Sequence, residues 1–231
     1  AVSADAAFPV PAETSLAEAA ILLASYSTAY YTLVNRGRLQ GGETVLVLGA
    51  AGAVGSASVQ LAKALGARVI ASASTEAKCA AAMMAGADAA ILSGDADWRD
   101  AVRNANDGRP VDVVVDPVSG PFTEPAFRSL AWGGRHLVVG FASGTVASLP
   151  VNLPLLKGAD LIGVDYRQGK ERDPGASDRI ARTLIEPFAA GRLKPSIGKV
   201  FGFERFAEAM NLVSSGAAIG RVLIAFGGSG S

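Results

Sequence analysis

Short apolar runs alternate with helical patterns through the middle of the chain. The runs are rich in valine, isoleucine, leucine and alanine, and they are too short for helices, so they predict buried strands. Strands that alternate with helices predict βαβ units, and strands that are apolar throughout predict a parallel sheet covered on both faces. We therefore expect a doubly wound α/β sheet, a Rossmann fold in three α/β/α layers. The strands are expected at 44–48, 69–73, 89–92, 111–115 and 136–139, and the helices at 53–65, 76–85, 98–106 and 123–130.

The two ends of the chain follow a less regular pattern. Ser15 followed by Glu18 predicts a capping box that opens a helix running toward Leu33. Gly191 is placed to end a helix in a left-handed conformation. The other elements expected after Gly140 are a sixth strand at 161–164, a polar loop at 169–175, helices at 177–190 and 206–214, and a strand at 221–226.

This pattern predicts four segments. They are a lead-in segment with its helix (1–40), a Rossmann dinucleotide-binding domain (41–170), C-terminal helices with a return strand (171–226), and a flexible Gly/Ser tail (227–231).

Composition excludes several classes of function. The chain has 21 basic and 21 acidic residues, so it has no net positive charge that would attract nucleic acid or an anionic membrane. One His and one Cys can form neither an internal disulfide nor a Cys/His zinc site, so no metal is expected. The two uncharged stretches, 19–35 and 45–62, are too polar or too interrupted by glycine to span a membrane. Without a secretory signal either, the expected location is the cytoplasm.

The segment 45–55, VLVLGAAGAVG, places three glycines between a strand and a helix. Gly49 would release the strand into the turn, Gly52 would let the backbone approach a diphosphate, and Gly55 would let the helix pack on the strand. The N–H groups of Gly52, Ala53 and Val54 are expected to face that diphosphate. The alternative is a tight turn without a ligand.

The end of the second strand indicates which dinucleotide is bound. An acidic residue there would bind the ribose hydroxyls of NAD, but this strand ends in Ala73-Ser74, and Lys78 follows. A charge-assisted bond of about 1.5–3 kcal/mol from Lys78 to a 2′-phosphate would favour NADPH roughly ten- to a hundredfold. The alternative is that Lys78 is an ordinary solvated residue.

Two further loops end strands at the same predicted edge, 116–120 and 140–144, and could meet the nicotinamide ribose and ring or could merely turn the chain. Asp116, ahead of Pro117, could equally hold its loop. His136 lies inside an apolar run, which favours a structural role. Cys79 has no neighbouring base to make it a nucleophile.

Several ordered motifs together resemble the zinc-free medium-chain dehydrogenase/reductases, in the branch of the NADPH:quinone oxidoreductases and enoyl reductases. They are AAILLASYSTAYYTL, GETVLVLGAAGAVGSASVQLAKALGARVIA, VDVVVDPVSG, GGRHLVVGFASG and LPVNLPLLKGADLIGVD. The resemblance extends to Phe226. It implies hydride transfer from NADPH to a quinone or to an activated enone or enoyl double bond, with neither a metal nor an obvious side-chain proton donor. We therefore assign no catalytic residue.

The resemblance also implies a role for individual positions. Thr28 would approach the nicotinamide, and Arg221 stands where the family often has a lysine near the cofactor. The remaining implied contacts are the diphosphate loop (Ala51, Gly52, Ala53, Val54 and Gly55), the 2′-phosphate pair (Ser74 and Lys78), the ribose loop (Asp116, Pro117 and Val118) and the nicotinamide loop (Gly140, Phe141 and Ala142).

The chain departs from the family pattern in three places. It begins near the crossover from a GroES-like N-terminal domain, which would form the other wall of the substrate cleft. A tyrosine that many relatives carry after the third strand is replaced by Ser93-Gly94, and an arginine of some relatives is absent near Gly216. The last two differences would remove contacts to the 2′-phosphate.

Two functions follow from the sequence. One is an NADPH-dependent reductase or its cofactor-binding part, and the other is a non-catalytic NADPH-binding module that acts as a sensor or in association. The resemblance further implies a homodimer in which the edge strand at Leu161–Val164 pairs with its copy, since an unpaired edge is otherwise a liability.

Overall fold

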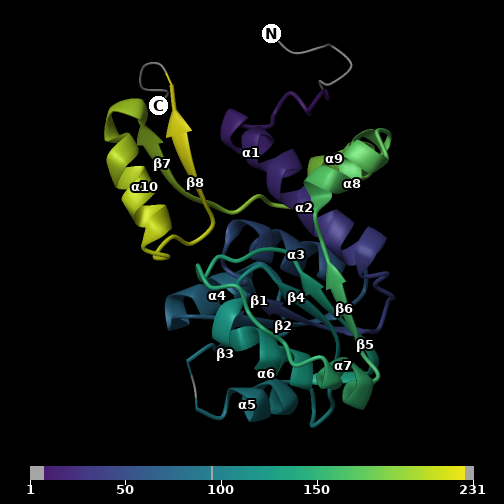
Figure 1. Ribbon diagram of the computed structural model, residues 1–231. Helices are drawn as coiled ribbons and strands as arrows, with labels where there is room; N and C mark the ends of the chain where they lie inside the picture. The colour runs from purple at the N-terminus through teal and green to yellow at the C-terminus, as the bar shows by residue number, and fades with distance from the viewer. Residues whose placement is uncertain (1–7, 95, 227–231) are drawn as a thin grey trace.

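Six parallel strands form one sheet in the computed structural model, which describes residues 8–94 and 96–226. The strand order is β3-β2-β1-β4-β5-β6 (Figure 1). The chain builds the sheet outward in one direction from β1 to β3, and in the opposite direction from β4 to β6. This is the doubly wound order of a Rossmann fold, so the expected fold class is confirmed. The strands are β1 (Thr44–Leu48), β2 (Arg68–Ala73), β3 (Ala89–Leu92), β4 (Val111–Asp116), β5 (Leu130–Val138) and β6 (Asp160–Gly163).

Helices cover both faces of this sheet, and each face has its own core. Alternate residues of β1 point to opposite sides: Val45 and Val47 belong to one core, and Leu46 and Leu48 to the other. Every residue of β1 is buried, which explains why the strand is apolar at every position after Thr44. The first face is covered by α3 (Ala53–Ala64) and α4 (Glu76–Met84), and the second by α5 (Trp98–Ala105), α6 (Thr123–Arg128) and α7 (Asn152–Lys157).

The N-terminal helical segment packs on α3 and so joins the first core. The Ser15 hydroxyl accepts from the Glu18 N–H while the Glu18 carboxylate accepts from the Ser15 N–H, which confirms the predicted capping box. The segment comprises α1 (Leu16–Ile21), α2 (Ser27–Tyr30) and two π-helical stretches at Leu22–Tyr26 and Tyr31–Arg36. Such π-helical turns are frequent at functional sites.

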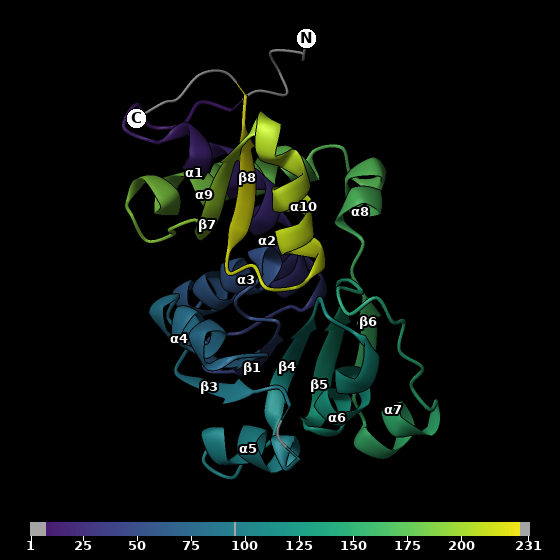
Figure 2. The same ribbon diagram turned by 90° about the vertical axis from the view of Figure 1, so that its left-hand side faces the viewer.

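The C-terminal part forms a second, two-stranded parallel sheet beside the first (Figure 2). Gly191 has a φ of +67° and follows the C-cap of α9, as predicted. The elements here are α8 (Tyr166–Arg172), α9 (Ala176–Ala189), β7 (Ile197–Gly202), α10 (Phe206–Ser214) and β8 (Arg221–Ala225).

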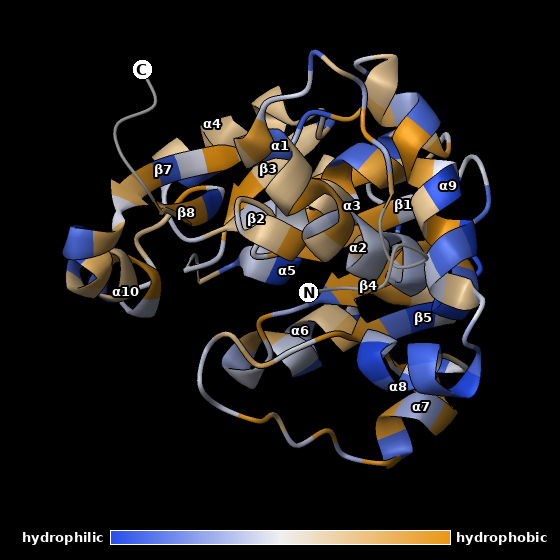
Figure 3. Ribbon diagram, turned by 90° about the horizontal axis from the view of Figure 1, so that it is seen from above, coloured by the Kyte–Doolittle hydropathy of each residue, from blue (hydrophilic) through white to orange (hydrophobic). Residues whose placement is uncertain are grey.

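Five elements differ from the sequence prediction. The prediction of a polar loop at 169–175 is wrong, because α8 extends to Arg172. The helix is hydrophilic along its length (Figure 3), so its sequence lacks the apolar periodicity that would predict a helix. The Asp165 side chain caps its N-terminus. The helix expected at 123–130 ends at Arg128, and β5 begins at Leu130 rather than at 136. Neither α7 nor β7 was predicted. The predicted tail at 227–231 lies outside the described residues.

No helix in the described part of the chain is both long and apolar enough to cross a lipid bilayer.

Glu43 and Arg135 form a bidentate ion pair beside β1, with both N–O distances at 2.7 Å. Burial alone would raise the pKa of Glu43, but hydrogen bonds from Arg135 and from the Gln40 N–H outweigh it and hold that pKa below its ordinary value. A lowered folded pKa means that the pair stabilises the fold above the unfolded pKa of about 4.3, and that this is lost as the pH falls through the folded value.

We expect E43Q to lower the free energy of unfolding by about 2 kcal/mol near pH 7 and by much less near pH 3. Urea unfolding at the two pH values measures this. A loss that is equal at both would contradict the role of the charged pair.

Candidate dinucleotide site

The glycine turn connects β1 to α3 in the geometry that the sequence predicts. Gly49 has a φ of +58°, and a Cβ at Gly55 would overlap the Gly49 carbonyl oxygen, so both positions require glycine. Gly52 is the N-cap of α3 and has no side chain to cap the helix. Within the described residues the N–H groups of Ala53 and Val54 have no acceptor, as an anion site at a helix N-terminus requires.

One detail of that prediction is wrong. The Gly52 N–H donates to the Gly49 carbonyl at 2.9 Å, inside the turn. Only the N–H groups after Gly52 are therefore open to a ligand.

The other predicted loops meet this turn at the carboxyl edge of the sheet. Strand β1 lies between β2 and β4, at the point where the winding reverses, which is where open α/β sheets bind ligands. A Cβ on Gly49 would come 2.7 Å from a methyl of Val118, so the loop after β4 packs directly on the glycine turn. A Cβ on Gly140 would come 3.3 Å from the Pro117 carbonyl oxygen, which joins the loop after β5 to the same group. Beyond Gly140, Phe141 and Ala142 are exposed.

Asp116 lies at the end of β4 and is fully buried. Its Oδ1 accepts the N–H groups of Val118 and Ser119 at 3.0 and 2.7 Å, and its Oδ2 accepts the Thr123 hydroxyl at 2.8 Å and lies 3.0 Å from the Nε2 of His136. A carboxylate has about four lone-pair positions, and four donors occupy them. The structure therefore supports the loop-holding interpretation of Asp116, while its implied contact to a ribose stays a prediction.

The pKa of Asp116 reflects the same contacts. Burial alone would raise this pKa, but the hydrogen bonds from His136, the Ser119 N–H and Thr123 together hold it below its ordinary value. The group is thus an ionised carboxylate that is inaccessible to solvent. The sequence had suggested a structural role for His136, and its complete burial supports that interpretation.

Ser74, which follows β2, and Lys78, on α4, lie within hydrogen-bond distance of each other, while their implied contact to a 2′-phosphate stays a prediction. The Lys78 ammonium donates to the Ser74 hydroxyl at 3.0 Å and to the Gly216 carbonyl at 2.5 Å. Ser74 is exposed and Lys78 is half-buried. The contact to Gly216 was not predicted, and it brings the loop between α10 and β8 over the same corner.

Arg221 follows that loop, at the start of β8. The Gly220 N–H donates to the Ala51 carbonyl at 2.8 Å, so the start of β8 lies beside the glycine turn. Nothing in the local sequence indicates this approach, because it depends on how the second sheet docks. Thr28 lies on α2, which packs on α3, and its hydroxyl donates to the Ala24 carbonyl at 3.3 Å.

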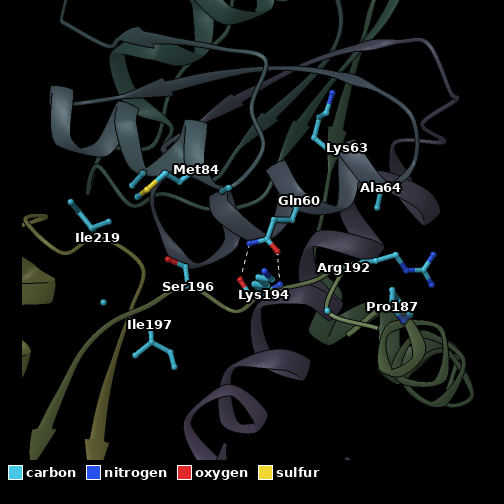
Figure 4. Close-up of a pocket in the computed structure, with 14 residues that line it drawn as sticks. Gln60, Lys63, Ala64, Met84, Pro187, Arg192, Lys194, Ser196, Ile197 and Ile219 are labelled. Carbon is cyan, nitrogen blue, oxygen red and sulfur yellow. Dashed lines mark hydrogen bonds between the residues drawn. The ribbon is translucent and has the colours of Figure 1, made fainter. Parts of the chain in front are cut away.

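A separate cleft lies away from the glycine turn. It measures about 780 Å³ and runs between the later turns of α3 and α4 and the segment before β7 (Figure 4). Gln60 closes one side by bonding both the N–H and the carbonyl of Lys194. None of the predicted site residues lines it, so the cleft and the glycine turn are two separate candidates for a ligand.

A family model described as "Zinc-binding dehydrogenase" matches residues 53–182, which contain the helix of the glycine turn and the ends of β2, β4 and β5. The chain belongs to this family. It corresponds to the cofactor-binding portion of a medium-chain dehydrogenase/reductase, as the sequence motifs implied.

Individual relatives agree with this assignment. The chain is 39% identical to quinone oxidoreductase-like protein 2 of Bos taurus over 216 residues, which are 93% of this chain and 62% of that protein. The crystal structure of the quinone oxidoreductase of Thermus thermophilus, also determined in complex with NADPH, is 29% identical with a TM-score of 0.82, covering 94% of this chain and 69% of that one. The CurK enoyl reductase is 25% identical with a TM-score of 0.85, covering 95% and 65%.

The family description mentions zinc. Within residues 8–94 and 96–226, no group of three or more His, Cys, Asp or Glu side chains could hold a metal ion. The donors within these ranges do not fit a zinc site.

Proposed function

We propose that this chain is the cofactor-binding part of an NADPH-dependent oxidoreductase that reduces a quinone or an activated enone or enoyl double bond without zinc. The observation that carries the proposal is the glycine turn at the winding reversal of the sheet, with a lysine in place of an acid at the end of β2. The relatives named as quinone oxidoreductases and enoyl reductases support the reaction class.

Each loop would have a distinct role in binding. The N–H groups of Ala53 and Val54 would bind the diphosphate, and the dipole of α3 favours its charge. Lys78 would donate to the 2′-phosphate, with Ser74 beside it. The loops 117–118 and 140–142 would hold the nicotinamide ribose and ring.

The dinucleotide supplies the hydride when it is bound, and these loops orient it. The chain spans 62% of the length of its bovine relative, so the substrate and the turnover of the whole protein are likewise proposed.

Turnover is tested by incubating the chain, and the longest natural polypeptide that contains it, with NADPH and a panel of quinones, enones and enoyl thioesters. We expect the longer polypeptide to consume NADPH with at least one acceptor class. Binding of NADPH without consumption by either protein would favour the alternative, a non-catalytic NADPH-binding module.

We also propose that the chain forms a homodimer through β6. This strand pairs only with β5 among the described strands, and Leu161 on it is 46% exposed. Arg36 donates to the Gly163 carbonyl at one end of β6, while Asp160 at the other end forms an exposed ion pair with Arg38 at 3.5 Å. An antiparallel pairing of two copies would place Asp160 of each beside Arg36 of the other. The exposed apolar side chains nearby, Trp132, Val151, Leu155 and Leu156, would extend the interface.

Light scattering tests this prediction. We expect a dimeric mass for the wild type and a monomeric mass for L161K, because an inserted lysine blocks strand pairing. V213K, on the exposed face of α10, is the matched control and should remain dimeric. A monomeric wild type would refute the interface.

A further inference from the structure

A buried pair of polar side chains lies beneath the two loops at the carboxyl edge of the sheet. His136 on β5 and Asp116 on β4 are both fully buried, with 3.0 Å between Nε2 and Oδ2. The imidazole also stacks on Phe127, at 6.0 Å between ring centroids. Its Nδ1 has no hydrogen-bond partner in the described part of the chain. A bare lone pair is cheaper to bury than an unpaired N–H, so the Nε2–H tautomer fits, and His136 donates to Asp116.

The carboxylate in turn holds the loop that follows it. Its Oδ1 bonds the N–H groups of Val118 and Ser119, and its Oδ2 bonds the Thr123 hydroxyl at the start of α6. Ser119 has a φ of +63°, which costs a non-glycine residue free energy. The loop therefore keeps this conformation because the Asp116 carboxylate is fixed in place.

The loop after β4 then positions the loop after β5. The Ala142 N–H donates to the Pro117 carbonyl at 3.1 Å, and the Ser143 N–H donates to the Val118 carbonyl at 2.9 Å. The Ser119 hydroxyl accepts the Ala147 N–H at 3.1 Å. Val118 also packs on Gly49 of the glycine turn. One carboxylate thus joins all three loops that the proposed dinucleotide would touch.

We propose that His136 is a positioning residue for dinucleotide binding, which fixes the Asp116 carboxylate and through it the loops at 117–119 and 140–143. The inference rests on the proposed function, because these loops are positioned for a dinucleotide only if one binds there. His136 itself touches no ligand. An apolar side chain in its place would leave Oδ2 buried with a single donor, and the carboxylate could rotate or admit water.

The test compares three variants in NADPH affinity and in amide hydrogen exchange without ligand. H136M removes the donor, H136Q returns an N–H near the position of Nε2, and T44V is the matched control. T44V deletes a buried hydrogen bond, from Thr44 to Asn106, at the opposite end of β1. We expect H136M to bind NADPH about tenfold more weakly and H136Q within about threefold of wild type. The Val118 and Ser119 amides should exchange faster in H136M only.

The outcomes separate this inference from the proposed function. A wild type that binds NADPH and an H136M that binds it equally well would overturn the inference alone. Equal weakening in H136M and T44V would also overturn it, because lost stability would then explain the effect. A wild type that binds neither NADPH nor NADH would overturn the proposed function and this inference together.

Discussion

G55A should weaken NADPH binding about a hundredfold while leaving a folded chain. The added Cβ would overlap the Gly49 carbonyl oxygen and lie 2.9 Å from the Ala50 Cα, and both are backbone atoms that cannot rotate aside. Such overpacking costs about 1–3 kcal/mol of stability and must be relieved by moving the turn away from α3. Because the turn presents the N–H groups of Ala53 and Val54, we expect affinity to fall about a hundredfold, measured by calorimetry.

G41A is the matched control for this prediction. Gly41 precedes β1 at the other end of the strand, and a Cβ there would meet nothing closer than 3.6 Å. The control should bind NADPH like the wild type. A G55A chain with unchanged affinity would show that the dinucleotide does not bind at the glycine turn.

K78M should weaken binding of NADPH about ten- to a hundredfold and leave the affinity for NADH nearly unchanged. The ammonium already lies 3.0 Å from the Ser74 hydroxyl, so a 2′-phosphate at this corner would gain a charge-assisted hydrogen bond of about 1.5–3 kcal/mol. NADH has no such phosphate. Parallel titration of both nucleotides measures the difference.

The contact from Lys78 to Gly216 needs its own control. K78M also releases the loop between α10 and β8, which would affect both nucleotides alike. K170M removes an exposed lysine on α8, whose ammonium lies over the Tyr166 ring of the same helix, and should change neither affinity. Equal losses for NADPH and NADH would mean that Lys78 orders the loop rather than selects the nucleotide.

Sequence reasoning predicted the parts of the molecule that are local in the chain. The strand β1, the glycine turn and α3 form one continuous segment, so its apolar run and three glycines suffice to predict it. The capping box at Ser15 and the glycine that follows the end of α9, Gly191, are local in the same sense. The parallel sheet followed from strands apolar on both faces.

Features that depend on tertiary contacts were not predictable. Strand β7 is exposed along most of its length, so it lacks the apolar run of a core strand, and only its pairing with β8 makes it a strand. The contacts of Gly216 with Lys78 and of Gly220 with Ala51 depend on the docking of that second sheet. The four donors to Asp116 come from three different elements. The sequence alone therefore could not show whether this carboxylate holds its own loop or binds a ligand.

The most direct test of a dinucleotide at the glycine turn is to titrate isotope-labelled chain with NADPH and follow the backbone amide resonances. We predict the largest shifts at Ala53, Val54, Ser74 and Phe141, with smaller shifts for NADH at Ser74. Shifts gathered instead at Gln60, Lys194 and their neighbours around the 780 Å³ cleft would contradict the account, as would the absence of any shift at saturating NADPH.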